Sequence, residues 1–227
     1  GSFEKTTYIS KVGVYDKNRN LVGIAKVATP VRKTVERDFT FKIKLDLWYY
    51  SYMILGIDVS TSITGYTLLD STGKIVECGH VDMRKEKNFF KKAALVEDAL
   101  ARITSYTTIQ AVYIEQPFLF FKSGGSSAAT MAVLQKFNGV VSWVCYNLFD
   151  IEPQYLRAQE ARKLCGINVP RGQKAKKVVM DFILDNVPDF DVVYTRQGNP
   201  RPGYADRADS YVVAKAALTR ENQETKD

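Results

Sequence analysis

The sequence predicts an α/β protein with a β-rich segment at its N-terminus. Three observations lead to this prediction: a short apolar strand that contains an acid at Met53–Val59, an amphipathic helix at Asn88–Thr104, and a second apolar strand at Ile109–Ile114. A strand, a crossover helix and another strand form the right-handed unit that places two parallel strands in one sheet. With 227 residues, 45% of them hydrophobic, the chain is long enough for one sizeable core.

The N-terminal segment is predicted to form a small β-sheet. Strand-like patterns occur at Val12–Tyr15, Leu21–Val27 and Phe39–Leu47. Polar residues between the first two of these are typical of a hairpin loop. We assign residues 1–52 to an N-terminal extension of unknown function, and the alternative that they form an extra layer packed on the core stays open. Residues 53–219 then form the main domain and residues 220–227 a polar tail.

Strands and helices are both predicted along the main domain. Two tight hairpins are predicted after the first strand. A Ser/Thr-rich turn at residues 60–62 precedes the second apolar run, and an Asp-Ser-Thr-Gly turn at residues 70–73 precedes the third. The further predicted strands are Tyr66–Leu69, Lys74–Gly79 and Phe149–Glu152. The further predicted helices are Ala128–Leu148, Ala158–Leu164, Gly172–Leu184 and Ala205–Thr219.

Charge and cysteine content limit the possible functions. The net charge of +7 favours an anionic partner, although charge alone is a weak indication. Residues 1–52 contain ten Lys/Arg against five Asp/Glu, a net charge of +5, and residues 53–227 carry the remaining +2. Three cysteines without CxxC or Cys/His spacing argue against disulfides and structural zinc. No apolar run approaches the roughly 20 residues of a membrane span, so we expect no membrane segment.

The basic residues of the main domain are concentrated in one stretch. Between positions 157 and 177 the chain has one acid, Glu160, and seven bases: Arg157, Arg162, Lys163, Arg171, Lys174, Lys176 and Lys177. Such a run either binds phosphates or forms the solvated face of a helix, and both interpretations stay open. The single histidine, His80, follows the predicted third strand and has no partner motif, so we expect a structural role.

Four acids are candidates for one metal-binding site. Asp58 lies within an apolar strand and Glu115 ends another, and an unpaired charge is costly there. Asp206 and Asp209 are three residues apart on the last predicted helix, so they share a face. Two divalent ions that clamp an in-line phosphoryl displacement need several such oxygen ligands. For either helical acid alone, a helix cap, a surface charge or an ordinary ion pair is the more common explanation.

Three motifs resemble those of the RuvC-type Holliday junction resolvases, which belong to the RNase H-like nuclease superfamily. They are Ile54-Leu-Gly-Ile-Asp-Val-Ser60 with Thr64-Gly65-Tyr66, then Ile114-Glu-Gln-Pro-Phe118, and Ala205-Asp-Arg-Ala-Asp-Ser210, in the order in which the family has them. The resemblance implies an RNase H-like mixed sheet flanked by helices. It also implies a metal-dependent, structure-selective endodeoxyribonuclease that hydrolyses branched DNA in recombination or repair.

The resemblance implies roles for particular residues. Asp58, Glu115, Asp206 and Asp209 correspond to the catalytic ligands of Mg²⁺, for which Mn²⁺ substitutes. Phe118 resembles the aromatic residue that stacks at the junction crossover. Basic residues expected to contact the DNA backbone are Lys122, Arg162, Lys163, Arg171, Lys174, Lys176 and Lys177. The expected partners are four-way junctions and a second copy of the chain in a homodimer, for which Ala128–Leu148 is the candidate interface.

The chain also departs from the family pattern. Val59-Ser60 stands where the family usually has Pro-Gly, and Ser210-Tyr211 where Ala-Leu is common. Together with the N-terminal extension, these differences indicate a divergent phage-type member in the cytoplasm of a bacterial or phage-infected cell. The preferred cleavage sequence and the strictness for four-way junctions stay open.

Two alternative functions stay open beside the nuclease. An actin or hexokinase-type phosphotransferase also begins with Gly-Ile-Asp-x-Ser, but it needs a second α/β domain to close over ATP. A module that binds branched DNA without cutting it is expected to lack a metal ligand. Because all four acids are present, the nuclease is the favoured interpretation.

Overall fold

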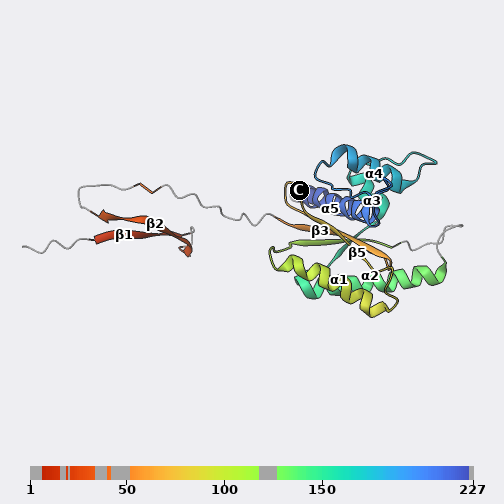
Figure 1. Ribbon diagram of the computed structural model, residues 1–227, viewed down its shortest axis with the longest axis horizontal. Coiled ribbons are helices and arrows are strands. Elements are labelled where there is room, and N and C mark those ends of the chain that lie inside the picture. The colour runs from red at the N-terminus through yellow and green to blue at the C-terminus, as the bar shows by residue number, and fades with distance from the viewer. Residues whose placement is uncertain are drawn as a thin grey trace, which may run out of the picture. The chain divides into compact units, whose positions relative to one another are not determined.

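The computed structural model describes residues 7–15, 19, 21–33, 40–41, 52–117 and 127–224, and it divides the chain into two compact units, Gly1–Tyr49 and Tyr50–Asp227. In the first unit, β1 (Thr7–Tyr15) and β2 (Leu21–Lys33) form an antiparallel hairpin (Figure 1). This agrees with the two predicted strands, although both are longer than predicted. The predicted strand at Phe39–Leu47 lies outside the described residues, apart from two positions that form no strand.

The second unit contains a five-stranded mixed sheet in the order β5-β4-β3-β6-β7. Its strands are β3 (Ile54–Asp58), β4 (Ile63–Leu69), β5 (Ile75–Asp82), β6 (Ala111–Glu115) and β7 (Gln154–Leu156). Strand β4 pairs antiparallel with both β3 and β5. On its other side β3 pairs parallel with β6, and β6 pairs parallel with β7. Crossover helices supply the parallel connections, as the apolar patterns predicted.

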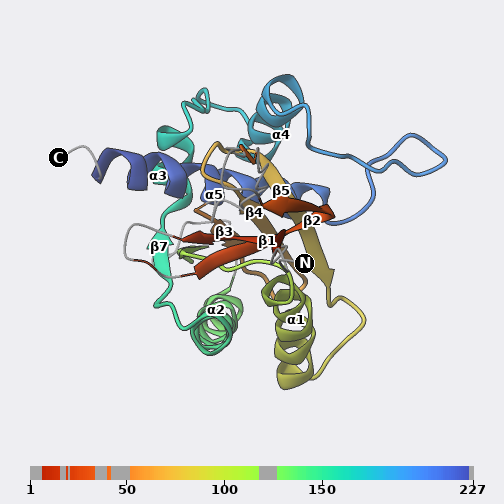
Figure 2. The same cartoon turned by 90° about the vertical axis from the view of Figure 1, so that its left-hand side faces the viewer.

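Helices cover both faces of this sheet (Figures 1 and 2). The helices are α1 (Phe89–Thr104), α2 (Ala128–Phe149), α3 (Ala158–Leu164), α4 (Ala175–Asn186) and α5 (Tyr204–Glu224). One apolar cluster packs α1 and α2 on one face, and a second packs α5 with α3 and α4 on the other. Among the described residues, no helix is both long and apolar enough to span a membrane.

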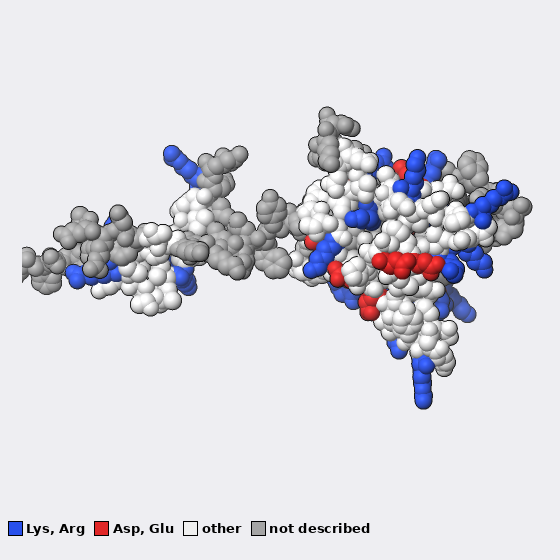
Figure 3. All heavy atoms as spheres, turned by 90° about the horizontal axis from the view of Figure 1, so that it is seen from above, with Lys and Arg blue, Asp and Glu red and all other residues white. Residues whose placement is uncertain are grey.

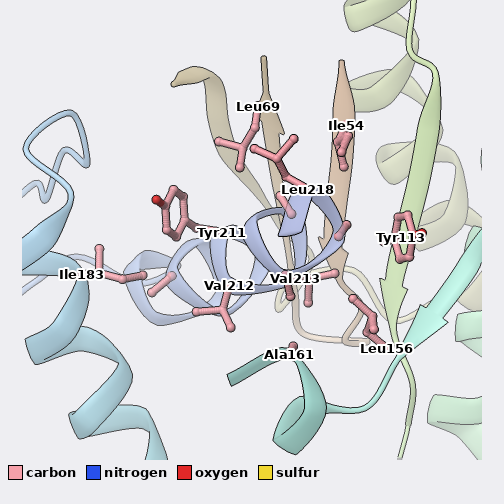
Figure 4. Close-up of a cluster of buried hydrophobic side chains, with 14 of the residues drawn as sticks. Ile54, Leu69, Tyr113, Leu156, Ala161, Ile183, Tyr211, Val212, Val213 and Leu218 are labelled. Atoms are coloured by element: carbon pink, nitrogen blue, oxygen red, sulfur yellow. The ribbon is translucent and has the colours of Figure 1, made fainter. Parts of the chain in front are cut away.

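Helix α5 lies at the centre of the second cluster, between the sheet and α4 (Figure 4). It crosses the sheet at two glycines. A Cβ on Gly56 of β3 would lie 2.3 Å from the backbone nitrogen of Ala214, and one on Gly65 of β4 would lie 2.0 Å from the carbonyl oxygen of Asp206. Only glycine permits so close an approach of helix backbone to strand.

Several predicted boundaries were wrong, among them the three that follow. The strand predicted at Phe149–Glu152 is instead β7, which begins after Pro153, because α2 continues to Phe149 and ends at Asp150 in a left-handed conformation (φ 55°). His80 lies within β5, which extends to Asp82, rather than after it. Helix α5 continues five residues past Thr219, where the Tyr113 hydroxyl donates a 2.6 Å hydrogen bond to Glu221.

Candidate functional site

Asp58 and Glu115 end two neighbouring parallel strands on the same face of the sheet. Asp58 is the last residue of β3 and Glu115 the last of β6, one position beyond the register pair Ile57–Ile114. Because side chains alternate along a strand, both acids share the face of Gly56, the face that α5 covers. The crossover connection and the strand register together place these two carboxylates side by side.

Helix α5 adds the other two acids at the same end of the sheet. Asp206 lies in its first turn, in contact with Gly65, and Gly65 pairs with Asp58 across β3 and β4. Asp209 follows almost one helical turn later. The next residue, Ser210, is fixed by a 2.8 Å hydrogen bond between its hydroxyl and that of Thr67. Three separate parts of the chain therefore supply the four predicted acids.

The turn after Asp58 is held by hydrogen bonds of its own. The Ser60 backbone N–H donates to the Thr64 hydroxyl (3.2 Å), which donates to the Ser60 carbonyl (2.9 Å). From α1, the Lys92 ammonium donates to the Thr61 carbonyl at 2.5 Å. These bonds join the end of β3 to the start of β4, so the backbone that carries Asp58 has little freedom.

The end of β6 is held from the other face of the sheet. Asn138 of α2 is only 5% exposed, and its side-chain amide donates to the Glu115 carbonyl at 3.1 Å. On the strand's other side, the Gln116 backbone N–H donates to the Leu156 carbonyl at 2.8 Å. Sequence reasoning missed Asn138 as a positioning residue. Its only signal was a polar residue on the buried face of an apolar helix.

Burial and mutual repulsion raise the pKa values of three of the acids. Burial is the largest cause for Asp58, and Glu115, Asp209 and Asp206 add to it, so the pKa of Asp58 lies well above its usual range. Burial, followed by Asp209, raises the pKa of Glu115 to about 7. Burial also raises the pKa of Asp209 to about 6, and the charge of Asp206 adds to this shift. These groups are therefore close enough to disfavour one another's charge.

Two of the predicted basic residues lie close to this acidic group. Lys176 of α4 lowers the pKa values of Asp58, Glu115 and Asp209, and Arg162 of α3 lowers those of the last two. Neither cation is strong enough to cancel the effect of burial. The structure thus brings a part of the basic stretch to the acids, as a site for phosphate requires.

The other predicted DNA-contacting residues are less closely tied to the acids. Lys163 lines a cavity of about 610 Å³ together with Arg162, at the end of α3. Arg171 and Lys174 are exposed, and Lys177 forms an exposed 3.0 Å ion pair with Asp181. Phe118 and Lys122 lie outside the described residues. Figure 3 shows many Lys and Arg side chains projecting from the visible face of this unit.

The chemistry of the donor set fits a hard divalent cation. Carboxylate oxygens are the ligands that Mg²⁺ and Mn²⁺ prefer, and a cation relieves the repulsion that raises these pKa values. In the part of the chain that the structure describes, no group of three or more His, Cys, Asp or Glu side chains is already arranged to hold an ion. Mutually repelling carboxylates are expected to lie apart unless a cation lies between them.

Comparison with known proteins identifies the fold. No protein-family model and no curated protein matches the sequence. Among solved structures, RuvC from T. thermophilus in complex with a Holliday junction substrate is similar over 77% of this chain and 97% of its own, with 11% identity and a TM-score of 0.54.

Two further structures agree with that match. A second T. thermophilus RuvC structure has 14% identity and a TM-score of 0.54, covering 76% of this chain and 97% of that one. The yeast mitochondrial Holliday junction resolvase Ydc2 has 12% identity and a TM-score of 0.52, covering 78% and 81%. The predicted fold is confirmed: the second unit of this chain has the RuvC-type, RNase H-like fold, a mixed sheet flanked by helices.

Proposed function

We propose that this chain is a metal-dependent endodeoxyribonuclease that hydrolyses phosphodiester bonds in four-way junctions or other branched DNA. The observation that supports this most directly is the convergence of acids from β3, β6 and α5 at one end of the sheet, with two cations beside them. The similarity to RuvC bound to a Holliday junction supports branched DNA as the substrate.

Asp58, Glu115, Asp206 and Asp209 are the residues that would hold Mg²⁺, with Mn²⁺ as a substitute. Such an ion supplies Lewis-acid polarisation of the phosphate and a more acidic bound water. The chain itself positions the oxygen ligands on the ends of two rigid strands and one helix. Lys176 and Arg162 place positive charge next to the acids, where the phosphates of an incoming strand need it.

DNA contacts are proposed to extend along α3 and α4. Arg162, Lys163, Arg171, Lys174, Lys176 and Lys177 form the proposed basic surface. Each phosphate that such a side chain contacts adds affinity without regard to base sequence. Phe118 and Lys122 stay proposals from the sequence alone, with Phe118 stacking on an opened base step.

The phosphotransferase alternative would need a second α/β domain to close over ATP. The described residues form one α/β unit and a two-stranded hairpin, and the convergence of the acids favours the nuclease. A module that binds branched DNA without cutting it differs from the nuclease only in having no cleavage activity. The experiment below distinguishes these two functions.

The experiment is a substrate panel at fixed salt and Mg²⁺: a four-way junction, a three-way junction, a flap, linear duplex DNA and an RNA–DNA hybrid. We expect cutting of the junction, weaker or comparable cutting of the other branched substrates, and little action on the duplex or hybrid. EDTA should abolish cutting, and Asp58→Asn should abolish it while leaving junction binding intact, because it removes a ligand and no phosphate contact. Full activity of Asp58→Asn, or preferential cutting of the hybrid's RNA strand, contradicts the proposal.

We also propose that the chain acts as a homodimer. A four-way junction has two equivalent cleavage points, and a two-fold pair of active sites matches that symmetry. Helix α2 supports this, because Trp143 is 63% exposed and Tyr146, one turn further on, is 50% exposed. Two large aromatic side chains on one helix face are typical of the centre of an interface.

A further inference from the structure

A second cationic cavity lies at the edge of the sheet opposite α3. Its walls are the end of β5, the segment before α5 and the first turns of α5, and its volume is about 350 Å³. Its lining includes His80, Asp82, Arg84, Val193, Arg201 and Arg207. Three arginines against one carboxylate make this cavity positive. None of these side chains belongs to the basic stretch that the sequence singled out.

The three arginines are held to different degrees. The guanidinium of Arg207 donates a 2.6 Å hydrogen bond to the Asp191 carbonyl and lies 5.3 Å over the Phe190 ring, so its charge is fixed in place. Its Nε atom is the one buried side-chain N or O atom in the described part of the chain that has no hydrogen-bond partner. Arg84 forms a bidentate pair with Asp82 at 2.6 and 2.9 Å.

Arg201 is the most available of these cations. Its side chain is exposed at the rim of the cavity, and its backbone N–H donates to the Val193 carbonyl at 2.8 Å, which anchors the segment that carries it. An exposed arginine beside a fixed one offers the planar donors that suit phosphate oxygens.

The cavity and the acidic site lie along the same row of paired residues in the sheet. His80, which lines the cavity, pairs with Gly65, and Gly65 pairs with Asp58. Further along the sheet, Glu115 pairs with Leu156 of β7. His80 also contacts Gly203 and is close enough to Asp206 for that carboxylate to act on its pKa. The four acids therefore lie between this cavity at one edge of the sheet and Arg162 of α3 at the other.

The distance between the arginine cavity at β5 and the basic residues that follow β7 suits a length of nucleic acid. Four strand spacings separate β5 from β7, about 19 Å at roughly 4.8 Å each. A B-form duplex rises 3.4 Å per base pair along its axis, so about five or six base pairs fit between them. A phosphate cut at the acids would have backbone phosphates within reach on both sides.

We propose that the cavity formed by Arg84, Arg201 and Arg207 binds a backbone phosphate of DNA, on the side of the acidic site opposite α3 and α4. This inference rests on the proposed nuclease function and adds a second point of attachment to it. The chain then holds its substrate on both sides of the reacting phosphate, and Asp82 restrains Arg84 until a phosphate competes for it.

The test is the salt dependence of junction binding by the full chain in EDTA, where no cutting occurs, between 50 and 200 mM KCl. Arg201→Ala should weaken binding of a labelled four-way junction by about 5–10-fold and lower the salt slope by about 0.9, the value for one phosphate contact. The matched control is Arg196→Ala, which removes an exposed arginine from the same segment outside the cavity and should leave both quantities unchanged.

A second variant predicts the opposite sign, which a folding defect cannot imitate. Asp82→Asn keeps an acceptor for Arg84 but removes the negative charge from the cavity, so it should tighten junction binding by about 2–3-fold. Thermal unfolding of each variant checks that the fold is intact.

Several outcomes separate the two proposals. Unchanged affinity and slope in Arg201→Ala and in the double variant Arg84→Ala/Arg201→Ala would overturn the phosphate site while leaving the nuclease intact. A wild-type chain that binds no junction at 50 mM KCl overturns the nuclease itself. Binding of a labelled nucleoside monophosphate that Arg201→Ala abolishes, with junction affinity unchanged, would instead assign the cavity to a small ligand and refute the DNA contact.

Discussion

Individual residues of the acidic site lie in surroundings that oppose their charge. Glu115 is mostly buried, and the charge of Asp209 raises its pKa further. A buried carboxylate of this kind lowers stability when it is ionised and has no cation to pair with. Proteins retain such groups where ligand binding or catalysis needs them.

The pH dependence of stability follows from the direction of these shifts. The pKa of Glu115 rises from 4.5 to about 7 on folding, so between these values the folded state binds more protons than the unfolded state. In EDTA, the stabilising effect of the protonated group should be complete below about pH 4.5 and lost as the pH rises through about 7. Glu115→Gln should therefore be more stable than wild type at pH 8 by about 1–3 kcal/mol, and equal to it at pH 4.

Urea unfolding at the two pH values measures this difference. Glu97→Gln on the exposed face of α1 makes the same chemical change without burial and should show no difference at either pH. Added Mg²⁺ at pH 8 should reduce the advantage of Glu115→Gln, because an ion bound by the acids stabilises the wild-type fold. If the free energies of unfolding of wild type and Glu115→Gln differ by the same amount at pH 4 and pH 8, the raised pKa of Glu115 is contradicted.

At the scale of elements, α5 determines the geometry of the site. It carries two of the acids, and its backbone lies directly against β3 and β4 at Gly56 and Gly65. Because the atoms it meets there are backbone atoms, no side-chain rotation can relieve added volume at these positions. Small changes at either glycine should therefore move the helix and its carboxylates.

Gly65→Ala is the sharpest test of this packing. The added Cβ would lie 2.0 Å from the Asp206 carbonyl oxygen, so the first turn of α5 must shift. We expect a loss of about 1–3 kcal/mol in the free energy of unfolding, together with a large loss of metal-dependent cleavage. The control is Gly23→Ala in β2, where an added Cβ would have no atom within 4 Å, and it should leave the unfolding of the second unit and cleavage unchanged. Equal stability of the two variants would refute the close approach.

For the whole molecule, the exposed aromatic face of α2 leads to a prediction about assembly. Trp143→Glu places a charge at the centre of the proposed interface, where an unpaired charge is costly. Sedimentation at micromolar concentration should find wild type as a dimer and this variant as a monomer with an unchanged circular dichroism spectrum. Glu152→Gln, away from this face, serves as a charge-change control. A wild-type monomer that still cuts junctions symmetrically would reject the dimer.

The division into two units predicts that the second unit is stable without the first. Every described member of the two apolar clusters lies between Tyr52 and Leu218. Removing residues 3–51 should therefore change the melting temperature of the rest by less than about 3 °C and preserve metal-dependent cleavage. The salt dependence of DNA affinity should become flatter, because a net charge of +5 is removed with the segment. Loss of folding on deletion would show instead that the segment is a packed layer of the core.

The sequence by itself determined the elements and the candidate acids. Apolar periodicity located β3, β6 and the long helices, and the crossover rule placed Asp58 and Glu115 at one end of the sheet. The spacing of Asp206 and Asp209 put both on one helix face. These features were predictable because each depends on a local pattern or on a rule of chain connection.

Only the tertiary structure decided which face of the sheet the acids occupy and what surrounds them. Strand β3 is buried on both sides, so its apolar run has no polar alternation that marks the face of Asp58. The support from Asn138, the approach of Lys176 and the arginine cavity beside β5 each join segments far apart in the chain. Such contacts depend on how helices pack on the sheet, and no local stretch of sequence specifies that packing.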